Sequence, residues 1–434
     1  MFSRVEQSFG NGRLTRFIAD RLMRSLRSSA LFHNFTAAAT LGVAIGASIA
    51  APAVSRAGPA SYESKHYTIT SDLDRDLTID IGRRADAMYD EYARRLSDFT
   101  PPAGAPRFEL RLFDRKRDYL KLTGDRFSNT GGIFMSGRNI LAVYVEEQGI
   151  ESMRRTLQHE AFHQFAYTNV SPNLPVWLNE GLAQVFEEGI FTGKGFQLGE
   201  IPPRRVRQLQ YDVNEKRLTP FRTFLALTDE QWQASLRDRS LAATHYNQSW
   251  AMVHFLVFAE RNGKYLYRNN LVDWLRRIHN GEEASEAFKQ AFSDNVEGFQ
   301  SRFAEFARSL EPTPQARAVE HQTVLADLLI ELRNRGKKFD TVQQFRDEVV
   351  RGRYRIQYSK GNIQWQTAED PLVYFSDLSG KPYGPKELFF SPSRDGVLPD
   401  LIARPATTLP LATRFYRLDG KIERETLVEP ARRR

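Results

Sequence analysis

The sequence of 434 residues predicts an α+β fold, in which a small N-terminal sheet and a helical part are followed by a smaller, strand-rich part. Three observations support this prediction. Strand-like and helical patterns mix over residues 62–145, helical periodicity dominates residues 151–310, and alternating apolar residues return after residue 350. The prolines in Glu311–Pro314 cannot continue a helix, so they mark the clearest domain boundary in the chain.

The N-terminal elements follow from local patterns. Residues 62–71 and 108–113 are predicted to be strands, and residues 77–96 and 115–122 to be helices. Two further strands are expected around a glycine-containing turn in residues 131–145, directly before the next helix. The second of them, Ile140–Val145, is either the edge of the sheet, where an extended peptide could be added as a strand, or an internal strand.

A long helix is predicted from Glu151 to Tyr167, a segment without proline or glycine. It carries a His-Glu-x-x-His motif at His159, Glu160 and His163. Two histidines four residues apart lie on one helical face, so both rings can bind one ion, and zinc suits two neutral imidazoles. Glu160 is then placed beside a metal-bound water as a general base. The alternative is a helix whose histidines merely flank a buried stripe.

A second helix is predicted over Val176–Glu187, which begins just after Pro175. It carries Glu180, 17 residues after His163, close enough for the chain to return to the motif. A carboxylate there completes a set of two histidines and one glutamate and leaves a fourth position open, as in catalytic zinc sites. The chain has no cysteine, so thiolate ligands are excluded. We expect one Zn²⁺ per chain.

At these residues the chain resembles the gluzincin metallopeptidases, specifically the peptidase MA-like group. The resemblance rests on the His-Glu-x-x-His motif followed by Trp177–Ala183, and it covers residues 105–260. It implies a zincin-like metallopeptidase domain with His159, His163 and Glu180 as zinc ligands and Glu160 as general base and proton shuttle. Many gluzincins carry an acid four residues after the ligand glutamate, where it orients a ligand histidine. Here that position is Gln184, which adds no negative charge.

The tetrahedral oxyanion formed during peptide hydrolysis needs a further hydrogen-bond donor. A helix predicted over residues 244–256 offers Tyr246 and His254, which lie within roughly 80° of each other around a 3.6-residue helix. Because the peptidase MA-like group has a similar aromatic and polar helix in this region, we favour Tyr246 over His254. Either side chain could instead be a core residue.

The basic excess of the chain lies mostly in its first residues. Seven arginines and two acidic residues give residues 1–57 a net charge of +5, out of +8 for the whole chain, so nucleic-acid binding is not indicated. An apolar segment, Phe35–Ala51, is followed by small-x-small cleavage sites. Residues 1–57 are thus expected to be a signal peptide. The alternative is a retained membrane anchor, and only then would a membrane be a partner.

The remaining organisation comprises a gluzincin-like domain, residues 61–310, and a C-terminal α/β accessory domain, residues 315–434. In the latter, helices are predicted over residues 323–333 and 341–350, then alternating strand residues, and a hairpin around Asp419-Gly420.

Two classes of function fit the sequence. The first is an exported zinc metallopeptidase, periplasmic, extracellular or associated with the cell envelope, that hydrolyses a peptide or protein substrate. The alternative is a non-catalytic exported or surface binding protein that retains the zincin fold. An intact Glu160 favours catalysis, because a binding-only site has no need of a base there.

Overall fold

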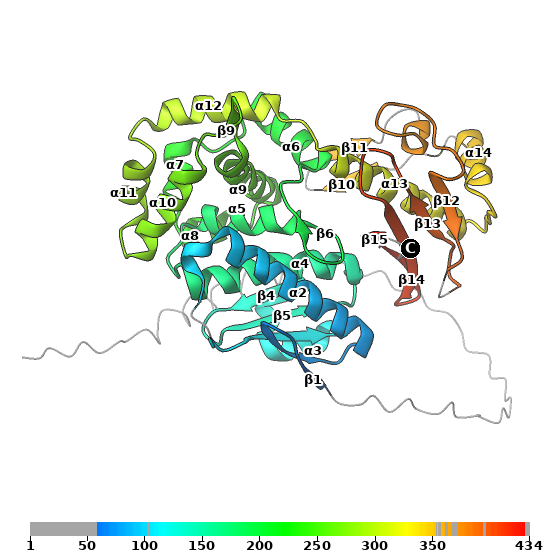
Figure 1. Cartoon of the computed structure of the whole chain (residues 1–434), viewed down its shortest axis with the longest axis horizontal. Coiled ribbons are helices and arrows are strands. Elements are labelled where there is room, and N and C mark those ends of the chain that lie inside the picture. Colours follow the sequence, from blue (N-terminus) through cyan, green and yellow to red (C-terminus); the bar gives the residue numbers. More distant parts are fainter. Residues whose placement is uncertain are drawn as a thin grey trace, which may run out of the picture. The chain divides into compact units, whose positions relative to one another are not determined.

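The computed structural model describes residues 59–101, 104–352, 354, 357–360, 363–366, 371–393 and 396–429. All of them belong to one compact unit, Ala57–Arg434. The expected signal peptide or anchor, residues 1–57, lies outside the described residues. Within the described part of the chain, no helix is long and apolar enough to cross a membrane. The predicted α+β plan is confirmed, with a small N-terminal sheet, a helical core and a strand-rich C-terminal part (Figure 1).

The N-terminal sheet has five strands in the order β1-β2-β3-β5-β4. Their bounds are β1 (Ala60–Glu63), β2 (Tyr67–Ser71), β3 (Phe108–Phe113), β4 (Gly132–Met135) and β5 (Ile140–Tyr144). The three central strands are parallel, whereas β1 and β4 are antiparallel to their neighbours. Helices α2 (Arg75–Arg95) and α4 (Gly149–Phe165) cover one face, and α3 (Lys116–Thr123) packs on the other (Figure 1).

The single strand predicted over residues 62–71 is wrong, because the structure has a hairpin of β1 and β2 there. The turn is held by Asp86 of α2, whose carboxylate accepts hydrogen bonds from the backbone N–H groups of Lys65 and His66. Ser64 also donates to Asp86 through its hydroxyl. These contacts take the backbone out of the extended conformation, and they depend on a helix that sequence alternation does not reveal.

The edge strand beside the motif helix is β4 and not the predicted Ile140–Val145. Strand β5 lies between β3 and β4 and pairs with both, so the expectation that it forms the edge is wrong. The chain turns back after β4 and enters the sheet interior, where β5 pairs in parallel with β3. Both strands are apolar, so their alternation does not distinguish the outer strand from the inner one.

The helical core is built around α4, α5 (Val176–Glu187) and α9 (Arg239–Phe258). Helix α4 continues into a short π-helical segment, Ala166–Val170. Helix α5 approaches α9 closely because Gly181 has no side chain; a Cβ there would lie 2.5 Å from the carbonyl oxygen of Ser249.

The other helices are α6 (Pro203–Asn214), α7 (Phe221–Leu225), α8 (Asp229–Ser235), α10 (Arg268–His279), α11 (Ala284–Ala291) and α12 (Val296–Ser309). Two short hairpins join them: β6 (Ile190–Phe191) with β7 (Phe196–Gln197), and β8 (Glu260–Arg261) with β9 (Lys264–Tyr265).

The C-terminal part begins with α13 (Pro314–Asn334), directly at the predicted boundary, and α14 (Val342–Gly352). A two-stranded ribbon, β10 (Gln357–Lys360) and β11 (Ile363–Gln366), follows, and residues 361 and 362 between the two strands lie outside the described residues. The last sheet is an antiparallel meander of β12 (Leu388–Ser391), β13 (Asp400–Ala403), β14 (Leu411–Leu418) and β15 (Lys421–Val428). The hairpin predicted around Asp419-Gly420 is confirmed, since Leu418 pairs with Lys421.

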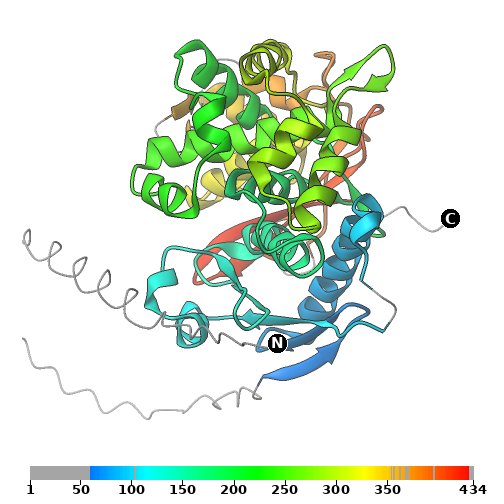
Figure 2. The same ribbon diagram turned by 90° about the vertical axis from the view of Figure 1, so that its left-hand side faces the viewer.

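The hairpin of β14 and β15 contacts the first turn of α4, the helix with the motif (Figure 2). Glu151 accepts hydrogen bonds from the Thr426 backbone (3.1 Å) and from Arg424 (3.0 Å). The hydroxyl of Tyr416 accepts from the Ile150 backbone N–H at 2.8 Å. By contrast, the large hydrophobic clusters on the two sides are separate, one ending at Leu310 and the other beginning at Ala318.

We expect a fragment of residues 61–310 to fold and bind zinc, because it retains one hydrophobic cluster and every proposed ligand. Losing the contacts to Glu151 and Ile150, each contributing about 0.5–1.5 kcal/mol, should lower its Tm by several degrees relative to the full chain. Zinc analysis and thermal unfolding of the fragment and the full chain test this. An insoluble or metal-free fragment would mean that the C-terminal hairpin is needed to complete the metal helix.

Candidate metal centre and active site

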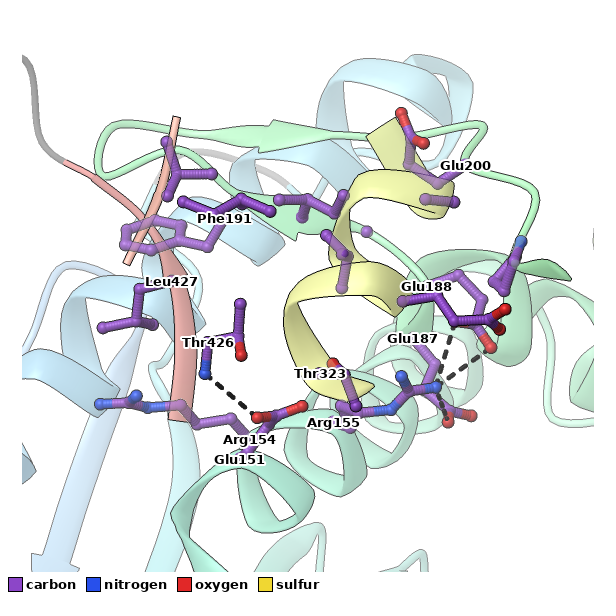
Figure 3. Close-up of a pocket in the computed structure, with 18 of the residues that line it drawn as sticks. Glu151, Arg154, Arg155, Glu187, Glu188, Phe191, Glu200, Thr323, Thr426 and Leu427 are labelled. Atoms are coloured by element: carbon purple, nitrogen blue, oxygen red, sulfur yellow. Dashed lines mark hydrogen bonds and ion pairs between the residues drawn. The ribbon is translucent and has the colours of Figure 1, made fainter. Parts of the chain in front are cut away.

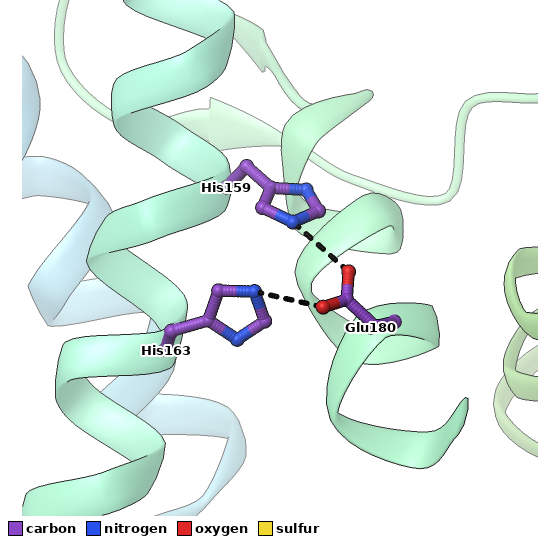
Figure 4. Close-up of side chains that lie close together, drawn as sticks. All are labelled: His159, His163 and Glu180. Carbon is purple, nitrogen blue, oxygen red and sulfur yellow. Dashed lines mark ion pairs between the residues drawn. The ribbon is translucent and has the colours of Figure 1, made fainter. Parts of the chain in front are cut away.

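Three predicted ligands converge in the structure from two helices (Figure 4). His159 and His163 lie one turn apart on α4, and Glu180 faces both from α5. The Nε2 atom of His159 is 3.2 Å from Glu180 Oε2, and that of His163 is 3.6 Å from Oε1. One potential ligand atom from each residue lies within 4.8 Å of the others. Among the described residues this is the group of His and acidic side chains that could hold a metal ion.

The geometry of this group fits a tetrahedral metal ion. Ligand atoms at about 2.0–2.1 Å from zinc lie about 3.3 Å from one another, close to the distances between Glu180 and the two imidazoles. Glu180 Oε2 is buried, and among the described residues it faces His159 Nε2 as an ion pair at 3.2 Å. A buried carboxylate needs a positively charged partner; in the metal-free protein the His159 ring supplies that charge, and a metal cation bound by both residues would replace it.

The outer nitrogens of both histidines face acceptors, which sets their tautomers. His159 Nδ1 lies 3.2 Å from Glu187 Oε2, and His163 Nδ1 lies 3.1 Å from Asn179 Oδ1. Because a carboxylate or amide oxygen can only accept, each Nδ1 carries a hydrogen, and each Nε2 faces Glu180, where its lone pair becomes available to a metal ion once Nε2 has lost its proton. This is the arrangement that metal-binding histidines require.

The carboxylate that orients His159 is Glu187, seven residues after Glu180, and the expected position, Gln184, does not do so. The two side-chain hydrogen bonds of Gln184 go to the Glu180 carbonyl and to Arg205. The sequence interpretation missed Glu187, although a spacing of seven residues returns to the same face of a helix and could have indicated it. The negative charge that Gln184 cannot supply beside His159 is therefore supplied by Glu187.

Arg155 binds the carboxylates of Glu187 and Glu188 (Figure 3). Arg155 of α4 donates to Glu187 at 3.0 Å and to Glu188 at 3.1 Å. Burial opposes ionisation of Glu187, but the hydrogen bond to His159 and the charge of Arg155 outweigh it and lower the pKa of Glu187 well below its usual value. The carboxylate thus stays charged at neutral pH.

The charges around His159 also govern its protonation. Burial works to lower its pKa, but hydrogen bonds to Glu180 and Glu187 outweigh this and raise the pKa of His159 well above its usual value. In the metal-free protein the ring is therefore positively charged at neutral pH. A metal ion has to displace that proton, so metal binding is coupled to proton release.

Glu160, the predicted base, lies on α4 beside His159 and His163, the two histidines proposed as ligands. Its Oε2 atom accepts a hydrogen bond of 2.9 Å from the backbone N–H of Phe134 on β4. His159, Glu160 and Tyr246 line one cavity of about 450 Å³. The edge strand thus fixes the orientation of the Glu160 carboxylate beside the cavity that His159 also lines.

The structure brings Tyr246 to this cavity but does not bring His254 there. Burial first, and then the charges of Glu180 and Glu160, raise the pKa of Tyr246, so its hydroxyl stays protonated and can donate. His254 is buried between the rings of Trp250 and Phe258, and burial lowers its pKa to about 4. The structure therefore favours the alternative that His254 is a core residue, because its face of α9 packs into the core.

Comparison with known protein families gives one finding. Residues 154–277 match a family described as a protein of unknown function, DUF1570. The matched stretch contains the three proposed ligands. It also contains Glu160, Glu187 and Tyr246. The family description names no activity. A comparison with curated proteins found no match.

We expect Glu187→Gln to weaken zinc binding by about 10–100-fold, the usual effect of removing an outer hydrogen-bond partner of a metal ligand. The amide keeps the side-chain shape but removes the charge that favours Nδ1–H on His159. Competition with a zinc-selective chelator measures the affinity. Gln184→Ala is the matched control on the same helix and should retain wild-type affinity. The reverse pattern would assign the orienting role to Gln184.

Proposed function

We propose that the protein is a zinc-dependent peptidase that hydrolyses peptide bonds with Glu160 as general base. The observation that carries this proposal is the convergence of His159, His163 and Glu180, whose potential ligand atoms lie within 4.8 Å of one another, with Glu160 lining the same cavity as His159. A zinc ion held by these three residues would polarise a substrate carbonyl and lower the pKa of a coordinated water to about 7.

Glu160 would move the proton in this reaction. Held by the Phe134 N–H, its carboxylate can accept a proton from the attacking water and deliver it to the nitrogen of the leaving amine. The C–N bond of the peptide then breaks, and a carboxylate and an amine leave the site. Removing the amide N–H of Phe134 by substitution is not possible without proline, so Glu160 itself is the residue to test.

Tyr246 is our proposed donor to the oxyanion that forms on the carbonyl. It lines the cavity from α9, opposite the motif helix, and its raised pKa keeps the hydroxyl hydrogen in place. A neutral donor aimed at developing negative charge in a site partly shielded from water is worth a few kcal/mol of transition-state stabilisation, on the order of 10²–10³ in rate.

Strand β4 supplies a place for the substrate backbone. Phe134 turns its N–H away from β5 to reach Glu160, so the outer edge of β4 faces the side on which the proposed base lies. An extended peptide can pair with this edge as an added strand next to the metal ligands. Because β4 rather than β5 is the edge strand, the proposed peptide-binding edge contains Phe134, the residue that contacts Glu160.

A non-catalytic binding protein with the same fold is the alternative. The orientation of Glu160 weighs against it, because a zinc site that only stabilises the fold is closed by four protein ligands and has no use for a base held beside it. Export remains a sequence-based prediction.

Digestion of a peptide library by the purified full chain tests the proposal. We expect new termini to appear, to disappear when zinc is removed by chelation, and to return when stoichiometric zinc is added. Mass spectrometry of the products would also give the cleavage preference. A zinc-loaded, folded protein that cuts none of the peptides would contradict the proposed function.

A further inference from the structure

The end of the catalytic cavity beyond His159 is rich in hydrogen-bond donors. Helix α4 contributes Ser152, Arg155 and Thr156 to its wall, and helix α6 contributes Arg204, Arg205 and Gln208. The acidic residues among its lining are Glu160, the proposed base, and Glu187. We call this end of the cavity, lined by Arg155, Arg204 and Arg205, the arginine end.

The three guanidinium groups share two buried carboxylates. All three donate to Glu188, from Arg155 at 3.1 Å, from Arg204 at 2.5 Å and from Arg205 at 2.6 Å. Glu187 accepts from Arg155, and the nearest nitrogen of Arg205 is 4.0 Å away. Three positive charges therefore face two negative ones, which leaves a surplus cation at the arginine end.

Two of these arginines have guanidinium N–H groups that make no hydrogen bond to the described residues. Arg155 and Arg204 each bind the carboxylates through Nη2, and no hydrogen bond within the described part of the chain uses their Nη1 or Nε atoms. Their side chains are 33% and 29% exposed, so a ligand can reach them. Because they are mostly shielded from water, a charge-assisted hydrogen bond to them is stronger than one at the surface.

The arginine end lies next to the metal centre. Glu187 connects the two, because the carboxylate that accepts from Arg155 also faces His159. A group bound by the spare guanidinium nitrogens would thus belong to a substrate residue close to the bond that is cut.

We propose that the arginine end binds a carboxylate of the substrate, so that the preferred peptides carry an acidic side chain or a free C-terminus near the cleaved bond. This inference rests on the proposed peptidase function. The planar guanidinium presents parallel N–H donors that match the two oxygens of a carboxylate, and the surplus charge favours an anion over a neutral amide. Ser152, Thr156 and Gln208 add neutral donors around the same space.

Binding to the zinc-loaded full chain carrying Glu160→Gln tests this proposal. The probes are fluorescein-labelled peptides of one length, in which a single Glu is moved through an otherwise neutral sequence. Each has a Gln counterpart, and each is made with a free and with an amidated C-terminus. Fluorescence anisotropy gives the Kd. We expect Glu at one position, or the free C-terminus, to bind about tenfold or more tightly than its neutral counterpart.

Arginine variants in the same background decide whether the preference arises at this place. Arg204→Gln should bring the ratio of the two Kd values close to one, and Arg204→Lys, which keeps the charge but not the planar fork, should reduce it less. Arg207→Gln is the matched control, since it lies on the same helix but does not line the catalytic cavity, and it should leave the ratio unchanged.

The outcomes separate this proposal from the proposed function. No preference for a carboxylate at any position, or a preference that persists in Arg204→Gln, overturns the carboxylate site. If Arg204→Gln does not fold, an unchanged ratio in Arg204→Lys overturns it. Cleavage by the wild type without acid preference would remove the site but leave the peptidase. Arg204-dependent binding without any cleavage by the wild type would leave the site and remove the peptidase.

Discussion

Glu160→Gln is expected to lower kcat by a factor of about 10²–10⁴ or more while the protein stays folded and keeps its zinc. The physical reason is that an amide cannot accept the proton from the attacking water, although it still fits the space beside Phe134. Because Glu160 is not among the three proposed ligands, the metal should be retained. Steady-state kinetics on a peptide found by library digestion, with zinc content measured on the same samples, test this.

Glu147→Gln is a suitable control for that experiment. Glu147 precedes α4, is 62% exposed and pairs with Lys116, so the same chemical change there should leave kcat as in the wild type. Unchanged activity in Glu160→Gln would point to a contaminating protease or to a mechanism with another base.

Replacing a ligand should have an equally large effect on the metal itself. We expect His159→Ala, His163→Ala and Glu180→Ala each to lose zinc during dialysis, because two remaining protein ligands do not hold the ion against solvent. Elemental analysis measures the zinc content, and circular dichroism shows whether the fold is kept. Chelation should lower the Tm of the wild type but not that of these variants, since ligand binding stabilises only a protein that binds it.

His66→Ala provides the comparison for the ligand variants, because His66 lies on the β1–β2 turn and pairs with Asp90. It should keep one zinc per chain. Full zinc occupancy in Glu180→Ala would show that Glu180 is not a zinc ligand.

The local parts of the site could be predicted from the sequence because their signals are local. The spacing of His159 and His163 requires a helix, and the surrounding residues favour one, so the structure has α4 there. Helix α5 has the predicted bounds, Val176–Glu187, because Pro175 defines its start. The hairpin at Asp419-Gly420 was equally clear, since that turn pairs neighbouring residues.

The parts that depend on long-range packing could not be predicted in this way. Which of two apolar strands is the outer one depends on the parallel pairing of β5 with β3, which is distant in the sequence. Tyr246 and His254 lie near each other around one helix, but only the packing of α9 against α5 decides that Tyr246 reaches the cavity and His254 the core. The role of Glu187 likewise depends on where arginines from α4 and α6 meet it.

The most direct test of the metal centre is X-ray absorption at the zinc edge of the zinc-loaded full chain. We predict one zinc per chain with only nitrogen and oxygen neighbours at about 2.0–2.1 Å, clear scattering from two imidazole rings, and one light ligand from solvent beside a single carboxylate. The chain has no cysteine, so no sulfur signal is expected. A protein that binds no stoichiometric zinc, or whose zinc spectrum lacks imidazole scattering, would contradict the assignment of His159 and His163 and with it the proposed peptidase.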